Sequence, residues 1–361
     1  MRTGVGVDIA AGGVRVAVTR THRGGSVEVR RLATVALPDG ALVDGVIIDE
    51  AAVAKALRAA LRAAGARRNG AVFAYHSKLA IAVRMGKLGG IQAAELEDYL
   101  RDGDEKVSPL VDLGSAVIAA ATPESDESGE VTIAAVVPAG IDALRALCAA
   151  AKVTPRAVDL SGAAILRVST QAPNSDTTHV ALVDIGATST TISIRLGRTL
   201  TAVQTLAVGA DTLTVALAQA LGELSPATLS LAELVKRDYD VDPRKRASRA
   251  ATTEDPALQD ALGKAADILI DHIAAAIDAL IDANAIRNGK KGPLDGVVLL
   301  GGGSLLRGMA ARFRHTTGTR ADTGKPWAFA GRKLRTTDEL TGPALLTTYA
   351  VAIGASMWRK P

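Results

Sequence analysis

The sequence predicts an α/β fold that consists of two similar domains. The first observation is the stretch 180–194, VALVDIGATSTTISI, which reads as a strand, a turn of small residues and a second strand rich in β-branched residues. The second is a related stretch at 5–18, VGVDIAAGGVRVAV. Each stretch is followed by a further β-rich run, at 26–37 and at 199–206. Self-similarity at this distance indicates a duplicated domain rather than a short-period repeat.

The turn of the second copy has the composition of an anion-binding loop. It consists of Gly186, Ala187, Thr188 and Ser189, which follow a strand that ends at Asp184 and Ile185. Residues without bulk let backbone N–H groups and the two hydroxyls close around an anion. Asp184 stands where an oxygen ligand of a phosphate-bound Mg²⁺ is expected. A hairpin with a polar turn and no ligand explains the same residues.

The turn of the first copy aligns with the second residue by residue. Asp8 corresponds to Asp184, and the turn Ala10, Ala11, Gly12 and Gly13 corresponds to the turn at 186–189. Two such turns that face each other could hold a polyphosphate between them.

A third glycine-rich junction lies near the C-terminus. An apolar strand predicted at 294–300 runs into Gly301, Gly302, Gly303 and Ser304, and a helix is predicted to start at Leu305. Such a junction lets the backbone approach a flat ligand closely, with helix N–H groups facing it. Glycines that serve the loop alone would also explain it.

The remaining elements follow in order. The first half holds a helix at 49–64 with Asp49 as its N-cap, a strand at 71–75, a helix at 141–152 and a strand at 157–160. Between them, 77–137 is predicted as a small inserted α/β subdomain, with strands at 79–85, 114–121 and 130–137 and a helix at 93–100. The second half holds a helix from Asp211, a helix from Pro226, an exposed charged loop at 238–255 and a long amphipathic helix at 258–286.

Composition restricts the function further. The chain has 361 residues, enough for two domains, and a formal net charge of only +4. Aromatic residues make up 2%, which argues against stacking platforms for nucleic acid. Cys148 is the only cysteine, so neither an internal disulfide nor a cysteine-based zinc site can form. The sequence contains no apolar stretch long enough to span a membrane and no signal-peptide core, and we expect a cytoplasmic protein.

Three motifs carry a family resemblance. DIAAGGVRV, DIGATSTTI and VVLLGGGSLLRG, in this order, resemble the two phosphate motifs and the adenosine motif of the actin-like ATPase superfamily. Within it, the inserted subdomain, the run VPAGIDALRALCAAAKVTPRAVDL at 137–160, the segment LVDGVIID at 42–49 and the run 345–358 are similar to PilM-like proteins of type IV pilus assembly, which are related to FtsA. The resemblance spans essentially the whole chain.

The resemblance implies a duplicated ribonuclease-H-like fold with two domains around a nucleotide cleft. The first domain would cover 1–160, with the inserted subdomain at about 77–137, and the second would cover 161–343. The C-terminal residues 344–361 would form a helix that packs back on the first domain.

The resemblance also implies the residues of an ATP and Mg²⁺ site. Asp8 and Asp184 would lie near Mg²⁺, most often through water, and the turns 10–13 and 186–189 would clasp the β- and γ-phosphates. Arg15 stands where relatives often have lysine. Glu233 and Lys236, spaced E-x-x-K, match the helix that contacts ribose and adenine. Gly301, Gly302, Gly303 and Ser304 would lie against the adenine and the α-phosphate.

One departure from the family pattern concerns hydrolysis. The first phosphate turn usually carries a serine or threonine, whereas Ala10 and Ala11 have no hydroxyl. A lost hydrogen bond to a charged group costs about 1.5–3 kcal/mol, so we expect nucleotide binding with weak or absent ATP hydrolysis. The sequence names no catalytic residue. Asp159 is a candidate to position water only by its place after a strand, and a turn-forming role explains it too.

Three functions are compatible with these features. The first is a cytoplasmic ATP-binding scaffold that docks the cytoplasmic N-terminal tail of a PilN-like inner-membrane protein, in a groove formed by the inserted subdomain and the neighbouring core. It would lie at the inner face of the membrane through this partner. The second is an FtsA-like division protein, which would carry a C-terminal amphipathic helix that the sequence lacks. The third is a small-molecule kinase, which requires a general base that the sequence does not supply.

Overall fold

Two mixed β-sheets organise the molecule. The computed structural model describes residues 2–23, 26–85, 95, 98–99, 114–121, 131–169, 178–248, 255–288, 293–324, 335–336 and 347–359. In these ranges the first sheet has the order β10 (Thr154–Leu160), β6 (Asn69–Tyr75), β1 (Arg2–Ala10), β2 (Gly13–Thr21), β3 (Val27–Val35) and β16 (Arg335–Thr336). The second has the order β15 (Ala321–Thr323), β14 (Gly296–Leu300), β11 (His179–Ile185), β12 (Thr190–Leu196), β13 (Thr199–Leu206), β7 (Ala80–Met85), β9 (Val131–Val136) and β8 (Val117–Ala121).

The two sheets repeat one topology, which confirms the predicted duplication. In each, three consecutive strands form an antiparallel meander, β1–β2–β3 in the first and β11–β12–β13 in the second. Two further strands then add in parallel beside the first strand of the meander: β6 and β10 in one sheet, β14 and β15 in the other. The two small-residue turns therefore occupy equivalent positions, between the first and second strand of each meander.

The segment inserted in the first half of the sequence extends the sheet of the second half. Strands β7, β9 and β8 follow one another in antiparallel order, and β7 pairs with β13 through Ala202 opposite Val83 and Val203 opposite Ala82. These strands agree with the predicted ones, while the predicted helix at 93–100 lies largely outside the described residues. The insertion is thus coupled by hydrogen bonds to a sheet that its neighbours in sequence do not form.

Helices on the outer face of the first sheet follow their sequence signals. Helix α1 (Glu50–Ala63) begins after Asp49, whose side chain accepts a hydrogen bond from the Ala52 amide at 2.9 Å. Its apolar stripe of Val53, Leu57 and Leu61 is buried in the first core, next to α3 (Pro138–Ala151). A short hairpin of β4 (Leu42–Val43) and β5 (Val46–Ile47) precedes α1.

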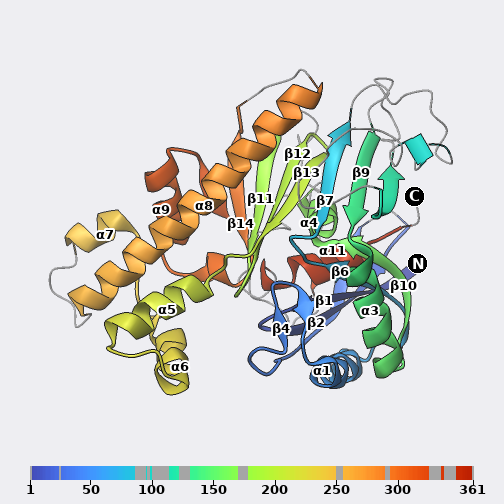
Figure 1. Cartoon of the computed structure of the whole chain (residues 1–361), viewed down its shortest axis with the longest axis horizontal. Coiled ribbons are helices and arrows are strands. Elements are labelled where there is room, and N and C mark those ends of the chain that lie inside the picture. The colour runs from blue at the N-terminus through green and yellow to red at the C-terminus, as the bar shows by residue number, and fades with distance from the viewer. Residues whose placement is uncertain are drawn as a thin grey trace.

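Two short helices lie at the centre of the molecule, where the halves meet (Figure 1). Helix α11 (Ala350–Ser356) is completely buried and packs on β1 and on α4 (Ser161–Ser169), and α4 in turn packs on β12. Glycine allows the close approach: a Cβ on Gly354 would lie 1.8 Å from the Ala164 carbonyl oxygen, and one on Gly6 would lie 1.9 Å from that of Ala352.

The outer helices of the second half gather around one long helix, which packs on strands β12, β13 and β7 of the second sheet (Figure 1). They are α5 (Asp211–Ala220), α6 (Pro226–Val235), α7 (Pro243–Ser248), α8 (Pro256–Asn288) and α9 (Met309–Thr317). Helix α8 supplies Leu269, Ile273 and Ile277 to the second core. Among the described residues, no helix has the length and apolar character that crossing a bilayer requires.

The prediction of an exposed loop at 238–255 was wrong for its first part. Residues 239–242 are buried, and α7 follows them. The Val241 amide donates to the Arg307 carbonyl at 2.8 Å, and Lys245 Nζ donates to Asp240 Oδ2 at 2.9 Å. The buried carboxylates thus have partners, which a charged sequence pattern alone does not reveal.

Candidate functional site

The first small-residue turn closes the hairpin between β1 and β2. Ala10 pairs with Gly13, and Ala11 and Gly12 form the tip. Gly13 has a φ of 144°, and a Cβ there would lie 2.7 Å from the Val35 carbonyl oxygen, so this position requires glycine. Gly12 is exposed, and its backbone is accessible to a ligand.

The second small-residue turn is held from outside by the start of α5. The Gly186 amide donates to the Ser189 carbonyl, and the amides of Ala210 and Asp211 donate to the carbonyls of Gly186 and Ala187, each at 2.9 Å. These bonds fix the turn without using its side chains. Within the described part of the chain, the half-buried hydroxyls of Thr188 and Ser189 have no hydrogen-bond partner. They remain available to an anion.

Asp8 lies at the centre of a charged cluster. It is buried, and it accepts hydrogen bonds from Arg15 Nη1 at 3.3 Å and from His76 Nε2 at 2.7 Å. Burial alone would raise the pKa of Asp8, but His76 and Arg15 together lower it below its usual range. Burial disfavours a charged His76, yet the Asp8 carboxylate raises the pKa of His76 above its ordinary value. The contact therefore favours the ionised form of Asp8 and the protonated form of His76.

Asp184 belongs to the same cluster electrostatically. Burial raises its pKa to about 6, with the positive charges of His76 and Arg15 opposing the rise and the negative charge of Asp8 adding to it. Gly301, with a φ of 76°, approaches this carboxylate so closely that a Cβ there would lie 2.4 Å from Asp184 Oδ1. The structure therefore brings Asp8, Arg15, Asp184 and Gly301 together, as the sequence predicted.

The glycine-rich junction differs from its prediction in two respects. Ser304 is buried, and its hydroxyl donates to the Gly301 carbonyl at 2.8 Å, so this side chain shapes the turn. The helix predicted from Leu305 begins only at Met309, after a single 3₁₀ turn, Gly303–Leu305. Leu306 is extended and Gly308 has a φ of 82°, which interrupts the helical path. Gly302 is the exposed member of the junction.

Glu233 and Lys236 form a polar network with α5. Lys236 Nζ donates to Thr214 Oγ1 at 2.8 Å, and Thr214 Oγ1 donates to Glu233 Oε2 at 2.9 Å, while Lys236 and Glu233 also form an ion pair. Burial opposes ionisation of Glu233, but Lys236 lowers its pKa. Burial raises the pKa of Asp211 at the start of α5, with Lys236 opposing and with Glu233 and Asp39 adding to the rise.

The sequence interpretation missed four residues of this arrangement: His76, Asp211, Thr214 and Asp39. Of these four residues, His76 was the easiest to predict from the sequence, because it directly follows the strand that lies parallel to β1. Carboxyl ends of parallel strands meet at one edge of a sheet, which places His76 beside Asp8. Asp39 lies in the first half, and its influence on Asp211 depends on how the two halves face each other.

Asp159 does not belong to this cluster. Its carboxylate forms an ion pair with Arg167 on α4, and Arg167 also reaches the Gly354 carbonyl at 3.5 Å. This arrangement supports the junction of α4 and α11.

The oxygen-bearing side chains of this site suit a hard cation that takes most of its ligands from water and phosphate. Within the described residues, no group of three or more His, Cys, Asp or Glu side chains is placed to hold a metal ion. Asp8 and Asp184 offer carboxylate oxygens, and Thr188 and Ser189 offer hydroxyls. Mg²⁺ usually binds through one or two carboxylates plus water and substrate phosphates, and these residues fit that requirement.

Comparisons with known proteins agree on the family and on the fold. Residues 6–360 match the family model described as "Type IV pilus assembly protein PilM". A solved structure described as a "PilM-PilN type IV pilus biogenesis complex" is similar to this chain, with a TM-score of 0.75 and 22% identity over 98% of this chain and 97% of the other. No curated protein matches the sequence.

Two further solved structures share the fold more distantly. EutJ, an ethanolamine utilization protein from Carboxydothermus hydrogenoformans, has a TM-score of 0.53 and 15% identity over 99% of this chain and 90% of its own. MreB 5 of Spiroplasma citri, bound to AMPPNP, has a TM-score of 0.51 and 11% identity over 98% of this chain and 95% of its own. These likenesses confirm the predicted actin-like fold.

Proposed function

The chain belongs to the type IV pilus assembly protein PilM family, and from this premise we propose that it is an ATP-binding scaffold of the pilus assembly machinery. In this role it binds a nucleotide between its two halves and docks the cytoplasmic tail of a PilN-like membrane protein. It would lie at the inner face of the membrane through that partner.

One observation carries the nucleotide proposal. The aspartates that precede the two equivalent turns, Asp8 and Asp184, belong to one electrostatic cluster with His76. The free hydroxyls of Thr188 and Ser189 then provide donors for phosphate from the second turn, while the first turn offers only backbone donors.

Each of the remaining residues would contact a different part of the nucleotide. Asp184 and Asp8 would hold Mg²⁺ through water, and Mg²⁺ would supply charge neutralisation for the phosphates. The network of Glu233, Lys236 and Thr214 would face the ribose and adenine. The backbone of Gly301, Gly302 and Gly303 would lie against the adenine and the α-phosphate, with Ser304 supporting the turn from inside.

Two features support slow or absent hydrolysis. Ala10 and Ala11 bring no hydroxyl to the first turn, and Asp159 is already ion-paired with Arg167. A nucleotide that is bound but slowly turned over can serve as a structural link between the halves, with α4 and α11 as the region where they move relative to each other.

The inserted segment is the proposed docking site for the partner's peptide. In the described part of the second sheet, β8 has a neighbouring strand on one side only, and Val117 on it is 44% exposed. An extended peptide can add to such an edge by backbone hydrogen bonds. The similar solved structure described as a PilM-PilN complex favours a partner of this kind.

The nucleotide proposal is tested by isothermal titration of the full chain with ATP and Mg²⁺. We expect binding by the wild type and its loss in Asp184→Ala. Arg62→Ala, an exposed change on the distant helix α1, is the matched control and should bind as the wild type does. Absence of binding by the wild type would contradict the proposal.

The docking proposal is tested with a synthetic peptide of the PilN-like tail. Val117→Pro removes a backbone donor from β8 and should abolish binding, whereas Val117→Thr keeps the strand and should retain it. Equal affinity of both variants would exclude strand addition at β8.

A further inference from the structure

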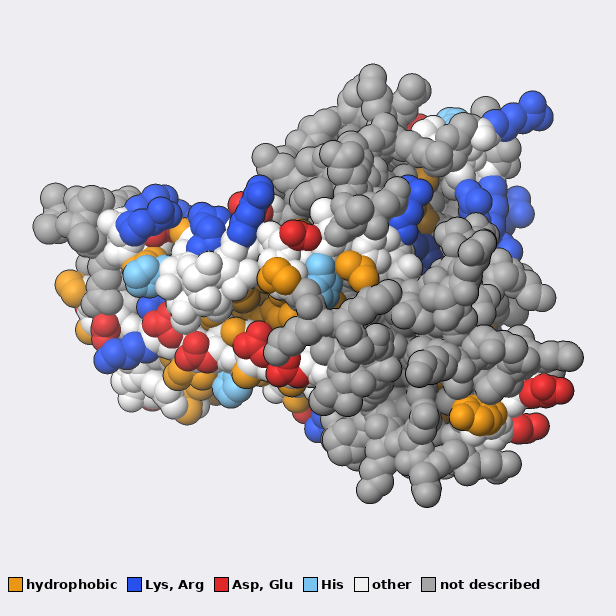
Figure 2. Space-filling view, turned by 90° about the horizontal axis from the view of Figure 1, so that it is seen from above, with side chains coloured by type: hydrophobic (Ala, Val, Ile, Leu, Met, Phe, Trp, Pro, Cys, Tyr) orange, Lys and Arg blue, Asp and Glu red, His pale blue; other side chains and the backbone are white. Residues whose placement is uncertain are grey.

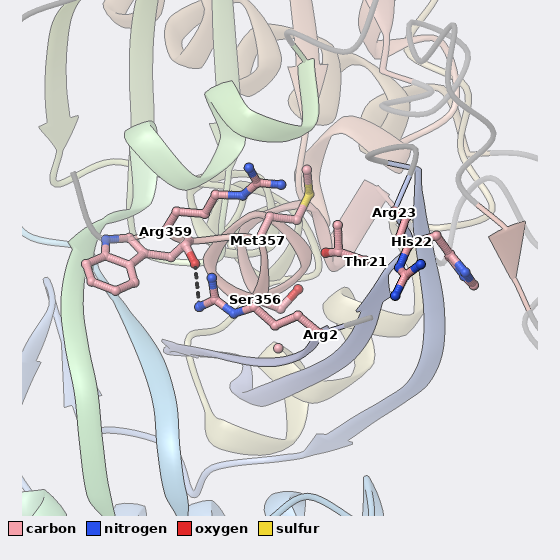
Figure 3. Close-up of a pocket in the computed structure, with 9 residues that line it drawn as sticks. Arg2, Thr21, His22, Arg23, Ser356, Met357 and Arg359 are labelled. Atoms are coloured by element: carbon pink, nitrogen blue, oxygen red, sulfur yellow. Dashed lines mark hydrogen bonds between the residues drawn. The ribbon is translucent and has the colours of Figure 1, made fainter. Parts of the chain in front are cut away.

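A cavity lies far from the two small-residue turns. It has a volume of about 340 Å³ and opens at the start of β1 and the end of α11 (Figure 3). Its lining consists of Arg2, Gly4, Thr21, His22, Arg23, Ser356, Met357, Trp358 and Arg359. Arg2 and Ala10 are the two ends of the nine-residue strand β1, so roughly 25 Å separates this pocket from the first turn. The pocket is distinct from the proposed nucleotide site.

The charged side chains that line this pocket are all basic. Arg2 and Arg359 enter from one side and Arg23 from the other (Figure 3), and the lining contains no carboxylate. Within the described residues, none of these three guanidinium groups forms an ion pair with an acidic side chain. His22, by contrast, contacts Glu28 at 3.1 Å. At the end of the molecule that carries α8 and α9, acidic and basic side chains are interspersed (Figure 2).

The positive charges of the pocket arginines also lie close to one another. Burial and the like charges of Arg156 and Arg359 lower the pKa of Arg2 from its ordinary value. Arg156 lies over the ring of Trp358, 5.5 Å from its centroid, which adds a further positive charge at the margin of the pocket. An anion that entered here would relieve repulsion among these cations.

The pocket is built on a rigid support. Arg2 Nη2 donates to the Trp358 carbonyl at 3.2 Å, which holds its guanidinium at the pocket wall. Thr19 and Ser356 share a hydrogen bond of 2.8 Å, and a Cβ on Gly4 would lie 1.9 Å from the Ser356 carbonyl oxygen. The end of α11 is therefore fixed on β1, and Met357 and Trp358, which also line the pocket, pack partly against the hydrophobic core.

We propose that this pocket binds a phosphate ester, with the phosphate beside Arg2 and Arg359 on one side of the pocket and with Arg23 adding positive charge from the other side. Guanidinium groups match the geometry of phosphate oxygens and bind them through paired hydrogen bonds. The volume suits a small ligand rather than a bare ion. A soluble phosphate ester and the headgroup of an anionic phospholipid share this chemistry, and the experiment separates them.

Trp358 is the natural reporter for this pocket. The chain has two tryptophans, so Trp327→Phe leaves Trp358 as the one fluorophore of its kind. This full-length variant is titrated with glycerol 3-phosphate, and separately with phosphatidylcholine vesicles that contain or lack phosphatidylglycerol. Saturating ATP and Mg²⁺ are present throughout, and the titrations are repeated in Asp184→Ala, so that a response from the nucleotide site is recognised.

Binding of the soluble ester identifies a free ligand, and binding of the anionic vesicles alone identifies a lipid headgroup; either result supports the proposal. Arg2→Gln and Arg359→Gln should each weaken binding about tenfold or more, because each removes a charge-assisted contact. Arg62→Gln is the control and should leave the affinity unchanged. The substituted pocket arginines are exposed, so thermal unfolding should be unaltered. No response to either probe, or equal binding by the arginine variants and the control, would overturn the proposal.

Discussion

Asp8 has the most side-chain partners in the charged cluster. Its carboxylate is buried and shared between Arg15 and His76, so its negative charge is balanced within the first half. Asp184, its counterpart in the second half, forms no ion pair with any described residue, and burial raises its pKa to about 6 although His76 and Arg15 oppose the rise. Two aspartates that align in sequence therefore have opposite electrostatic situations.

Removal of His76 is expected to destabilise the fold. His76→Ala leaves Asp8 buried with Arg15 as its one charged partner at 3.3 Å, which should lower the free energy of unfolding by about 1–3 kcal/mol. The folded-state pKa of His76 is raised, so its contribution is complete below its unfolded pKa and is lost as pH rises through the folded value. Urea unfolding at several pH values should show a larger difference between variant and wild type at acidic pH than at alkaline pH. His22→Ala, at a partly exposed pair with Glu28, is the control and should cost less.

Asp184 makes nucleotide binding depend on pH. The carboxylate with a pKa of about 6 is protonated below that pH and then no longer attracts Mg²⁺. Affinity for ATP with Mg²⁺ should fall as pH is lowered through 6 in the wild type and should lack this step in Asp184→Asn. The sign for stability is opposite: because folding raises this pKa, the folded state loses stability as pH rises from the unfolded value toward 6. At neutral pH Asp184→Asn should therefore raise the free energy of unfolding, by on the order of 1–2 kcal/mol. A wild-type affinity that stays constant across this range would contradict the assignment.

At the scale of elements, the contact between α4 and α11 determines how the halves meet. Both helices are buried between the sheets, and their approach depends on glycine, since the Ala164 carbonyl oxygen occupies the space beside Gly354. Arg167 and Asp159 extend the same contact from α4 toward β10. Because this junction consists of two short helices between the sheets, we expect any rotation of the halves to take place around it.

A methyl group at this contact should separate the helices. Gly354→Ala places its Cβ 1.8 Å from a backbone oxygen that cannot move without its helix, so we expect a loss of about 3 kcal/mol or more in the free energy of unfolding. Gly302→Ala is the matched control, because its added Cβ meets no atom within 4 Å. Thermal and urea unfolding measure both. A loss of less than about 1 kcal/mol for Gly354→Ala would show that α11 is free to shift.

At the scale of the whole molecule, the inserted segment connects the two proposed binding events. Its chain leaves the first half after β6 and returns to it at α3, while β7 is hydrogen-bonded to β13 of the second half. A rotation of the halves around α4 and α11 would therefore change the position of β8 relative to the first half. Nucleotide at the proposed site and peptide at β8 would then influence each other.

This coupling is measurable in both directions. We expect the affinity for the PilN-like peptide to change severalfold on addition of ATP and Mg²⁺, and the affinity for nucleotide to change by the same factor on addition of peptide, as linkage requires. Asp184→Ala should bind the peptide with an affinity that ATP does not alter. Equal peptide affinity with and without nucleotide in the wild type would show that the two sites are independent.

The local sequence determined the elements and the duplication. Periodic apolar residues specified α1 and α8, and the repeated run of an apolar strand, an aspartate and a small-residue turn identified two equivalent hairpins, because these signals depend on neighbours along the chain. Only the tertiary structure decided the partners of those elements. It placed His76 against Asp8, turned Ser304 inward and buried residues 239–242. It also attached the inserted strands to the second sheet and gathered arginines that have no acidic partner among the described residues around the end of α11. Each of these results joins residues distant in sequence, and burial and charge in such contacts depend on the arrangement of the whole chain.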